Sequence, residues 1–442
     1  MSTLVLKNGR VFDPSQGLDK VADLLVDAEK GTIKDIGPNL RGDQSLDCSG
    51  KLVCPGFIDI HVHFREPGAS NKESIATGCA SAVHGGFSTA VTMPNTDPPL
   101  DNRAALAYQY LQAGNAGKAR LFAMGCITRG RNGTELADLG LMAAGTGGLP
   151  GAVAFTDDGA AVPGSMVMRS AFEYASALKR VIVEHCEDHD LSNGCIMHEG
   201  KISAALGING YPSAGEEIIL ARDIRLAKLT GARFHVAHIS AKGSVALVRE
   251  AKAKGVKVTA EVTPHHLLLT DESCRNFDPA YKMNPPLREQ SDIDACLEGL
   301  RDGTLDCLAS DHAPHTSEDK AKEFVEAPNG CIGLESSIGV MLTKLVHTGK
   351  LTLARFVEAW TTAPVRCLGL EPFGVTGTLR VGGKADVTVI DLDQNWTLDA
   401  DAFKSKGRNC PFKAWQLRGA PVYTLVDGTV HEAIGMTMRE KR

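Results

Sequence analysis

The feature that constrains this chain most is a series of β-rich segments in its middle, separated by stretches long enough for a helix. Eight such segments occur, at residues 56–64, 88–95, 119–126, 151–158, 180–186, 233–240, 257–264 and 306–312. Strands that alternate with helices predict a parallel sheet, and eight of them predict an α/β fold of the (β/α)8 TIM-barrel type. A doubly wound sheet is the alternative, but it would rarely use eight strands with polar residues at the end of so many.

The two ends of the chain are also β-rich but have no helical periodicity. Residues 4–12 contain an Asn8-Gly9 hairpin signal, and residues 422–430 contain an Asp427-Gly428 turn between β-rich arms. We expect the ends to pair outside the barrel. They would form a small β-sandwich domain from residues 1–53 and 371–442, beside a catalytic barrel of residues 54–370.

Charge and composition argue against several classes of partner. The chain has 47 Lys and Arg against 53 Asp and Glu, and only 5% aromatic residues, so neither a basic footprint nor stacking platforms for nucleic acid are expected. We find no apolar stretch near the roughly 18 residues that span a bilayer, and no signal peptide. The 12 Cys are scattered without a CxxC pair, as in reducing compartments. We therefore expect a cytoplasmic protein without nucleic-acid or membrane partners.

Polar residues end many of the predicted strands, and barrel active sites lie at that face. His61 and His63 are two apart on the first strand, so both side chains share one face. Converging buried imidazoles are costly unless they bind hydrogen-bond partners or a metal. His185, His238 and Asp311 end later strands. This set suits one or two divalent ions, with zinc the expected metal.

The fourth strand ends in two adjacent carboxylates, Asp157 and Asp158. Neighbouring strand residues point to opposite faces, so only one of them can face the centre. That carboxylate would be a suitable bridge between two cations, while the other would cap the next helix or pair with a loop. Position alone does not choose between them.

Six motifs in order carry a resemblance to a known family. They are HVHFREPG at 61–68, MPNT at 93–96, FTDDG at 155–159, MNPPLR at 283–288, SDHAPH at 310–315 and NGCIGLE at 329–335. With the flanking KNGRVFDP at 7–14 and SKGRNCPF at 405–412, the chain resembles a class I dihydroorotase of the amidohydrolase superfamily. The resemblance spans nearly the whole chain.

The resemblance implies a metal centre with His61 and His63 on one ion, and His185 and His238 on the other. It assigns the bridge to Asp158, the second Asp of FTDDG, and leaves open one zinc or two per chain. Many cyclic amidases of the superfamily bridge with a carboxylated lysine instead. Residues 151–161 contain no Lys, which argues against that version here.

The implied reaction is the reversible cyclisation of N-carbamoyl-L-aspartate to (S)-dihydroorotate and water in de novo pyrimidine (UMP) biosynthesis. Metal-activated water would attack the ring amide, and Asp311, itself a metal ligand, would serve as general base and then general acid. Dimers are common in the family, so a homodimer is expected. A complex with aspartate transcarbamoylase is also compatible with the resemblance.

The substrate carries a carboxylate, and Arg65 lies two residues beyond His63, on the same face and nearer the rim. It suits bidentate carboxylate capture. The resemblance adds Asn95, Asn284 and His315 around that carboxylate or the ring. Each has a structural alternative: a surface ion pair for Arg65, turn positions for the two Asn, and a solvated loop for His315.

Two other functions compete with this one. A related cyclic amidase, such as a hydantoinase, dihydropyrimidinase or allantoinase, would use a similar centre, but Arg65 and SDHAPH favour an acidic substrate. An inactive subunit that only scaffolds aspartate transcarbamoylase would have lost ligands, and here all are present. Residues 314–332 follow the last strand, are rich in Asp, Glu and Lys, and are expected to cover the site as a lid.

Overall fold

The computed structural model describes residues 2–440 and has a strand at each of the eight central β-rich segments. These strands are β6 (Phe57–Val62), β7 (Phe87–Thr92), β8 (Arg120–Ala123), β9 (Ala154–Phe155), β10 (Val181–Glu184), β13 (Phe234–Val236), β14 (Val258–Val262) and β15 (Cys307–Leu308). The predicted strand positions are therefore confirmed, although most strands are shorter than the β-rich segments that contain them.

The eight strands pair in parallel as two ladders. One has the order β6-β7-β8 and the other the order β15-β14-β13-β10-β9. Two isolated parallel bridges lie between the ladders, from Gly125 to Phe155 and from Val62 to His312. Because paired parallel strands run in one direction, their carboxyl ends lie along the same edge, where ligands bind in α/β sheets.

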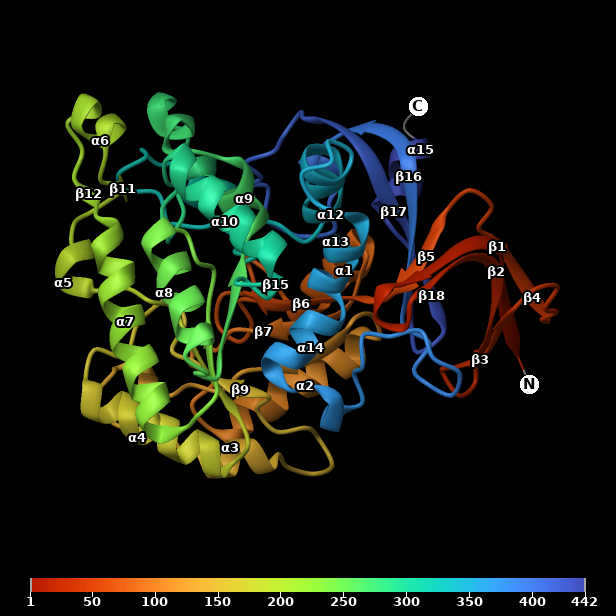
Figure 1. Ribbon diagram of the computed structural model, residues 1–442, viewed down its shortest axis with the longest axis horizontal. Coiled ribbons are helices and arrows are strands. Elements are labelled where there is room, and N and C mark those ends of the chain that lie inside the picture. Colours follow the sequence, from red (N-terminus) through yellow and green to blue (C-terminus); the bar gives the residue numbers. More distant parts are fainter. Residues whose placement is uncertain (1, 441–442) are drawn as a thin grey trace.

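Helices follow most of these strands and cover the parallel core (Figure 1). The longer ones match the predicted helical stretches, as in α1, whose N-cap Ser74 side chain accepts a hydrogen bond from Thr77 N. These are α1 (Ile75–Gly85), α2 (Arg103–Ala116), α4 (Ser165–Ala177), α7 (Ser213–Thr230), α8 (Lys242–Ala253) and α10 (Gln290–Asp302). Shorter elements are α3 (Leu139–Ala144), α5 (His189–Ser192), β11 (Met197–His198), α6 (Lys201–Leu206), β12 (Gly210–Tyr211), α9 (Pro264–Leu268), α11 (Ser317–Lys320), α12 (Ser337–Met341), α13 (Leu353–Trp360) and α14 (Thr362–Leu368).

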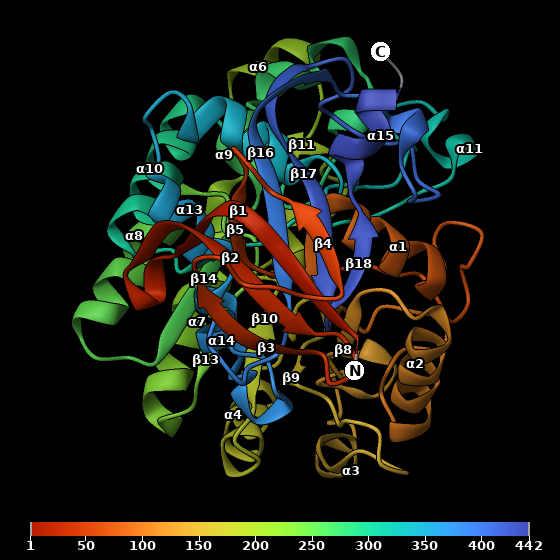
Figure 2. The ribbon, with the colours of Figure 1, turned by 90° about the vertical axis from the view of Figure 1, so that its right-hand side faces the viewer.

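The two ends of the chain form one eight-stranded sheet, which faces the viewer in Figure 2. Its order is β18-β17-β16-β5-β1-β2-β3, with β4 paired to β1. The ends join where β5 runs antiparallel to β16, with Val53 opposite Val389. The strands are β1 (Thr3–Asp13), β2 (Leu18–Asp27), β3 (Thr32–Gly37), β4 (Gln44–Asp47), β5 (Leu52–Pro55), β16 (Val387–Thr397), β17 (Gln416–Val426) and β18 (Thr429–Glu432), and α15 (Ile434–Glu440) follows.

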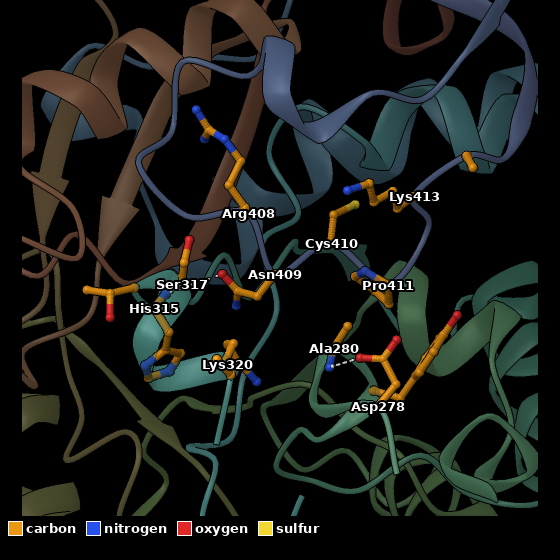
Figure 3. A pocket seen from close by; sticks show the side chains of 14 residues that line it. Asp278, Ala280, His315, Ser317, Lys320, Arg408, Asn409, Cys410, Pro411 and Lys413 are labelled. Atoms are coloured by element: carbon orange, nitrogen blue, oxygen red, sulfur yellow. Dashed lines mark hydrogen bonds between the residues drawn. The ribbon is translucent and has the colours of Figure 1, made fainter. Parts of the chain in front are cut away.

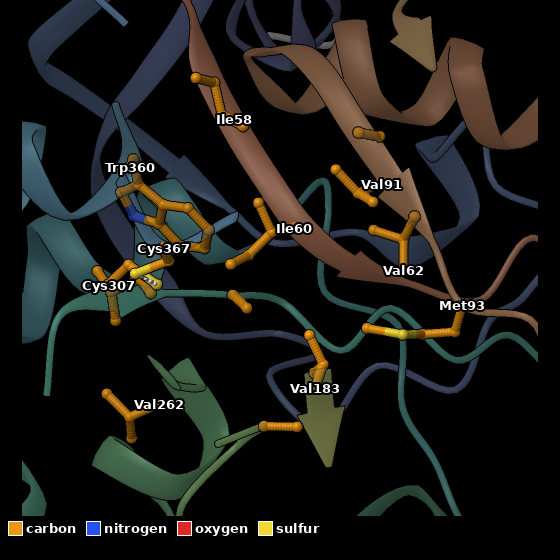
Figure 4. Packing of buried hydrophobic residues seen from close by; sticks show 14 of the residues in the cluster. Ile58, Ile60, Val62, Val91, Met93, Val183, Val262, Cys307, Trp360 and Cys367 are labelled. Atoms are coloured by element: carbon orange, nitrogen blue, oxygen red, sulfur yellow. Dashed lines mark hydrogen bonds between the residues drawn. The ribbon is translucent and has the colours of Figure 1, made fainter. Parts of the chain in front are cut away.

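The buried apolar side chains form two clusters. Leu6, Leu24 and Val389 belong to the cluster under the terminal sheet. The larger cluster fills the space between the central strands and their helices, and Figure 4 shows Val62 and Trp360 among its side chains. Eleven of the 12 Cys are buried as free thiols, as expected for small apolar residues. Within residues 2–440, no helix is long and apolar enough to cross a membrane.

Candidate metal centre and substrate pocket

The six predicted ligand residues meet at the carboxyl edge of the parallel strands. His61 lies near the end of β6, and His63 follows that strand. The other four come shortly after later strands: Asp158 after β9, His185 after β10, His238 after β13 and Asp311 after β15. All six side chains are buried. Four histidines and two carboxylates from five strands therefore share one enclosed space.

Asp158 lies at the centre of this cluster. Its Oδ1 is 3.5 Å from His61 Nε2 and 3.5 Å from His238 Nε2, and 3.8 Å from His185 Nδ1. Its Oδ2 is 3.4 Å from His63 Nε2. Burial alone would raise the pKa of Asp158, but the surrounding imidazoles, His61 first, hold that pKa well below its ordinary range. The carboxylate stands between the two histidine pairs, where a bridging ligand would stand.

Asp311 faces the first histidine pair. Its Oδ1 is 3.0 Å from His63 Nε2 and 3.6 Å from His61 Nε2. Burial opposes ionisation, yet hydrogen bonding and charge from these histidines lower the pKa of Asp311 below its ordinary value. Asp311 (φ 46°) and His238 (φ 28°) both have the left-handed backbone that residues other than Gly rarely adopt. Such strain persists where the surrounding structure enforces it, often at functional sites.

The donor atoms fit a divalent cation. His61 Nε2 and Asp158 Oδ1 are buried without a hydrogen-bond partner, which is costly for a polar atom. His185 Nδ1 and His238 Nε2 face each other at 2.9 Å. Among the described residues, three groups have ligand atoms within 4.8 Å of one another. Two lie in this cluster, namely His61, Asp158 and His238, and His61, His63 and Asp311, and the third is His235, Glu261 and Cys307. Imidazole nitrogen and carboxylate oxygen are ligands typical of first-row divalent ions.

The alternative carboxylate, Asp157, has a different role. It accepts hydrogen bonds from the backbone N–H groups of Ile127 (2.9 Å) and Thr128 (3.1 Å), and from the Thr128 hydroxyl. Burial raises its pKa. Asp157 thus pairs with the loop after β8, while Asp158 faces the histidines. This difference follows from the three-dimensional arrangement, because spacing left both assignments open.

Outer carboxylates contact the histidines, and sequence reasoning missed them. Glu261 Oε1 lies 2.6 Å from His61 Nδ1, and Glu187 Oε2 lies 2.8 Å from His185 Nε2. Burial opposes ionisation of Glu261, but the adjacent histidines lower its pKa to about 2. The sequence contained a signal that could have identified Glu261, because it is the one charged residue in the strand Val258–Val262. A charge within a buried strand needs a partner.

The four predicted substrate residues line one cavity of about 220 Å³, together with His63, Asp158, His185, His238 and Asp311. Arg65 is half-buried there, and its Nε donates to Pro314 O at 3.3 Å. Burial lowers the pKa of Arg65 to about 10, so the guanidinium stays charged at neutral pH. The cavity therefore offers a cation beside the histidine cluster.

The other three predicted substrate residues already have contacts. Asn95 Oδ1 is 2.8 Å from His63 Nδ1, and Asn284 Nδ2 donates to Glu187 Oε2 at 2.9 Å. His315 Nε2 is 2.8 Å from the backbone oxygen of Asn329. Burial, then Arg65 and nearby lysines, lower the pKa of His315 to about 3, so its ring is neutral. Both Asn side chains thus also orient the histidine cluster, which was not predicted.

A larger cavity of about 570 Å³ is shown in Figure 3. His315 lines both this cavity and the smaller one. Asn409, from the C-terminal part of the chain, lines the larger cavity. Its Nδ2 donates to Ala313 O (3.1 Å) and Gly330 O (3.0 Å), and its Oδ1 accepts from His315 N (3.3 Å). Asn409 therefore ties together both ends of the 314–332 segment. Whether this segment acts as a lid stays a prediction.

Comparisons with known proteins identify the family of this chain. A family described as dihydro-orotase-like matches residues 50–244. A dihydroorotase from Pelotomaculum thermopropionicum is 47% identical over 97% of this chain and 98% of its own length. The chain belongs to the dihydroorotase family. Another dihydroorotase, from Geobacter metallireducens, is 44% identical over 97% of this chain and 99% of its own length.

Solved structures show the same overall fold. An L-hydantoinase (dihydropyrimidinase) from Arthrobacter aurescens aligns with a TM-score of 0.85 and 30% identity, over 98% of this chain and 97% of its own. A dihydropyrimidinase from Brevibacillus agri aligns with a TM-score of 0.81 and 22% identity, over 98% and 95%. Like other dihydroorotases and hydantoinases, the chain is a cyclic amide hydrolase with a mixed α/β fold.

Proposed function

We propose that this dihydroorotase-family chain catalyses the reversible cyclisation of N-carbamoyl-L-aspartate to (S)-dihydroorotate in pyrimidine synthesis. The observation that carries this proposal is the cavity of about 220 Å³, in which Arg65 stands beside the histidine–carboxylate cluster. A cyclic amide that bears a carboxylate fits both features. Arg65 would bind the carboxylate, and the cluster would receive the amide.

The expected cofactor is zinc, one or two ions per chain. His61 and His63 would hold one ion and His185 and His238 the other, with Asp158 between them and Asp311 beside the first pair. A bound divalent cation would supply Lewis acidity, which acidifies water and polarises an amide carbonyl. The buried, unpartnered His61 Nε2 and Asp158 Oδ1 support this assignment.

The chain's own residues perform the proton transfer and positioning. Asp311 accepts a proton from the attacking water and delivers it to the leaving amide nitrogen, as general base and then general acid. Arg65 fixes the carboxylate end of the substrate. Asn95 and Asn284 line the same cavity. Asn95 contacts His63, and Asn284 contacts Glu187. Cyclisation follows the same path in reverse.

For the fold, we infer that the eight parallel strands close into a (β/α)8 barrel of residues 54–370. The bridges from Gly125 to Phe155 and from Val62 to His312 support closure, because they lie where the two ladders meet. Residues 1–53 and 371–442 would form the β-sandwich domain. A homodimer, an association with aspartate transcarbamoylase and a cytoplasmic location complete the proposal.

A hydantoinase-like activity is the second candidate, since a hydantoinase shares 30% identity and the fold. Residues 151–161 lack the lysine of the carboxylated-lysine centres, which favours dihydroorotate.

The test is to assay dihydroorotate, hydantoin and allantoin by ultraviolet absorbance, and to count zinc per chain. We expect turnover of dihydroorotate with one or two zinc ions, lost on chelation and restored by zinc. Bound metal without dihydroorotate turnover would favour another amidase. The absence of both bound metal and turnover would favour a scaffold.

A further inference from the structure

A buried carboxylate beneath the cluster contacts residues of both proposed metal positions. Glu261 Oε1 is 2.6 Å from His61 Nδ1 and also accepts the backbone N–H of His238 at 3.2 Å. His61 belongs to the first proposed pair and His238 to the second. Glu261 and His61 are both at most 1% exposed, so water does not compete for these contacts.

The second oxygen of Glu261 has its own partner. Oε2 lies 3.1 Å from His235 Nε2, and His235 Nδ1 lies 2.8 Å from the Thr259 hydroxyl. His235 is fully buried and outside the proposed ligand set. The carboxylate is therefore held on one side by His235 and contacts His61 on the other, which leaves it little freedom to rotate.

We propose that Glu261, clamped by His235, is a positioning residue that sets the tautomer of His61 and the backbone of His238 for metal binding. This inference rests on the proposed function. Glu261 Oε1 already acts as an acceptor for the His238 N–H, and a hydrogen bond from His61 to the same oxygen at 2.6 Å places the proton of His61 on Nδ1. The lone pair is then on Nε2, the atom that faces Asp158 at 3.5 Å and has no hydrogen-bond partner.

The contact with His238 adds a second function. His238 has a φ of 28°, which costs conformational energy for a side chain with a Cβ. Its N–H bond to Glu261 helps to hold that backbone, and its Nε2 then lies 2.9 Å from His185 Nδ1. One carboxylate thus aligns ligands of both proposed ions. Partners of this kind change metal affinity by about 10- to 100-fold in other metal sites.

The experiment replaces Glu261 by Gln and measures zinc affinity by equilibrium competition with a chromogenic chelator. An amide has one acceptor oxygen, so it cannot accept from both His61 and His235. We expect the zinc dissociation constant of Glu261→Gln to rise about 10- to 100-fold. The KM for dihydroorotate at saturating zinc should stay within about twofold of the wild-type value.

The matched control is Glu335→Gln. Glu335 is also buried and accepts from a histidine, His84 Nδ1 at 2.5 Å, and from Ser81 Oγ at 2.7 Å, but it contacts none of the proposed ligands. Zinc affinity in this variant should match the wild type. Melting of the metal-free proteins by circular dichroism compares the general cost of removing a buried carboxylate in each variant.

The outcomes separate the two hypotheses. Wild-type protein that binds no zinc contradicts the proposed function itself. Wild-type protein that binds zinc, with Glu261→Gln binding equally well, contradicts the positioning role alone. If Glu261→Gln does not fold, His235→Leu decides, because it keeps the carboxylate and removes the hydrogen-bond partner of its Oε2. A severalfold weaker zinc affinity with unchanged KM supports the proposal, and unchanged zinc affinity overturns it.

Discussion

The proposed metal ligands in the pocket are held by strand ends, whereas much of the proposed substrate side is held by loops. Backbone bonds from His63 N to His312 O (2.8 Å) and from Ile239 N to Glu261 O (2.9 Å) continue the parallel pairing as far as the ligand positions. The backbone of His315 is instead held by a hydrogen bond to Asn409, a residue from the C-terminal part of the chain. The comparison teaches that the proposed metal ligands and the proposed substrate contacts rest on different parts of the structure, and separate substitutions should disturb them independently.

The largest effect is expected on the ligand side, from Asp311→Asn. The amide keeps the shape but cannot take up a proton, so kcat should fall about 10²- to 10⁴-fold with zinc content unchanged. Steady-state assays and metal analysis check both values. Asp157→Asn is the control: it should retain most turnover while losing about 1–3 kcal/mol of unfolding free energy from the weakened loop contacts. Near-normal turnover in Asp311→Asn would contradict the assignment.

On the substrate side, Arg65→Met should raise KM for dihydroorotate about 10- to 100-fold, the value of one charged hydrogen-bonded contact. Zinc content should not change, since Arg65 contacts none of the proposed ligands by hydrogen bond. Arg233→Met is the matched control, because Arg233 donates to the backbone oxygens of Arg366 and Cys367 instead. An unchanged KM in Arg65→Met would remove Arg65 from the substrate site.

A smaller effect is expected from Asn409→Ala, which removes the donor shared by Ala313 O and Gly330 O. Loosening of this loop should raise KM by about tenfold or less, as for the loss of about one buried hydrogen bond. Zinc affinity should remain at the wild-type value. Hydrogen exchange of residues 314–332, with and without substrate, would show the loosening and would also test the lid. A changed zinc affinity would mean that the two sides are not independent.

The smallest effect concerns acid stability. The pKa of His315 falls from 6.5 to about 3 on folding, so between these values the unfolded chain binds the proton and the native protein does not. Its contribution favours the native state above pH 6.5 and is lost as pH falls toward 3. Urea unfolding at pH 7 and pH 5 should therefore show a smaller stability loss in His315→Gln than in wild type. An equal loss would contradict a buried, neutral His315.

The residues that sequence reasoning placed correctly are those whose position follows from a strand. His61 and His63 share a face because strand side chains alternate, and His185 directly follows β10. Glu261 was missed even though it lies in β14. A carboxylate in a strand shows that a partner must exist, but not that the partner is His61, which is 200 residues away in the chain.

By itself, the sequence determined the eight strands and the family, and it predicted the proposed ligand residues, because alternating periodicity and motif order are local properties. Residue spacing left Asp157 and Asp158 open and only the family resemblance favoured Asp158, whereas the tertiary structure shows that Asp158 faces the histidines while Asp157 pairs with Ile127 N and Thr128 N. It also decided that Glu261 contacts His61 and that Asn409 holds the loop of His315. These contacts join segments far apart in the chain, and only packing brings such segments within hydrogen-bonding distance.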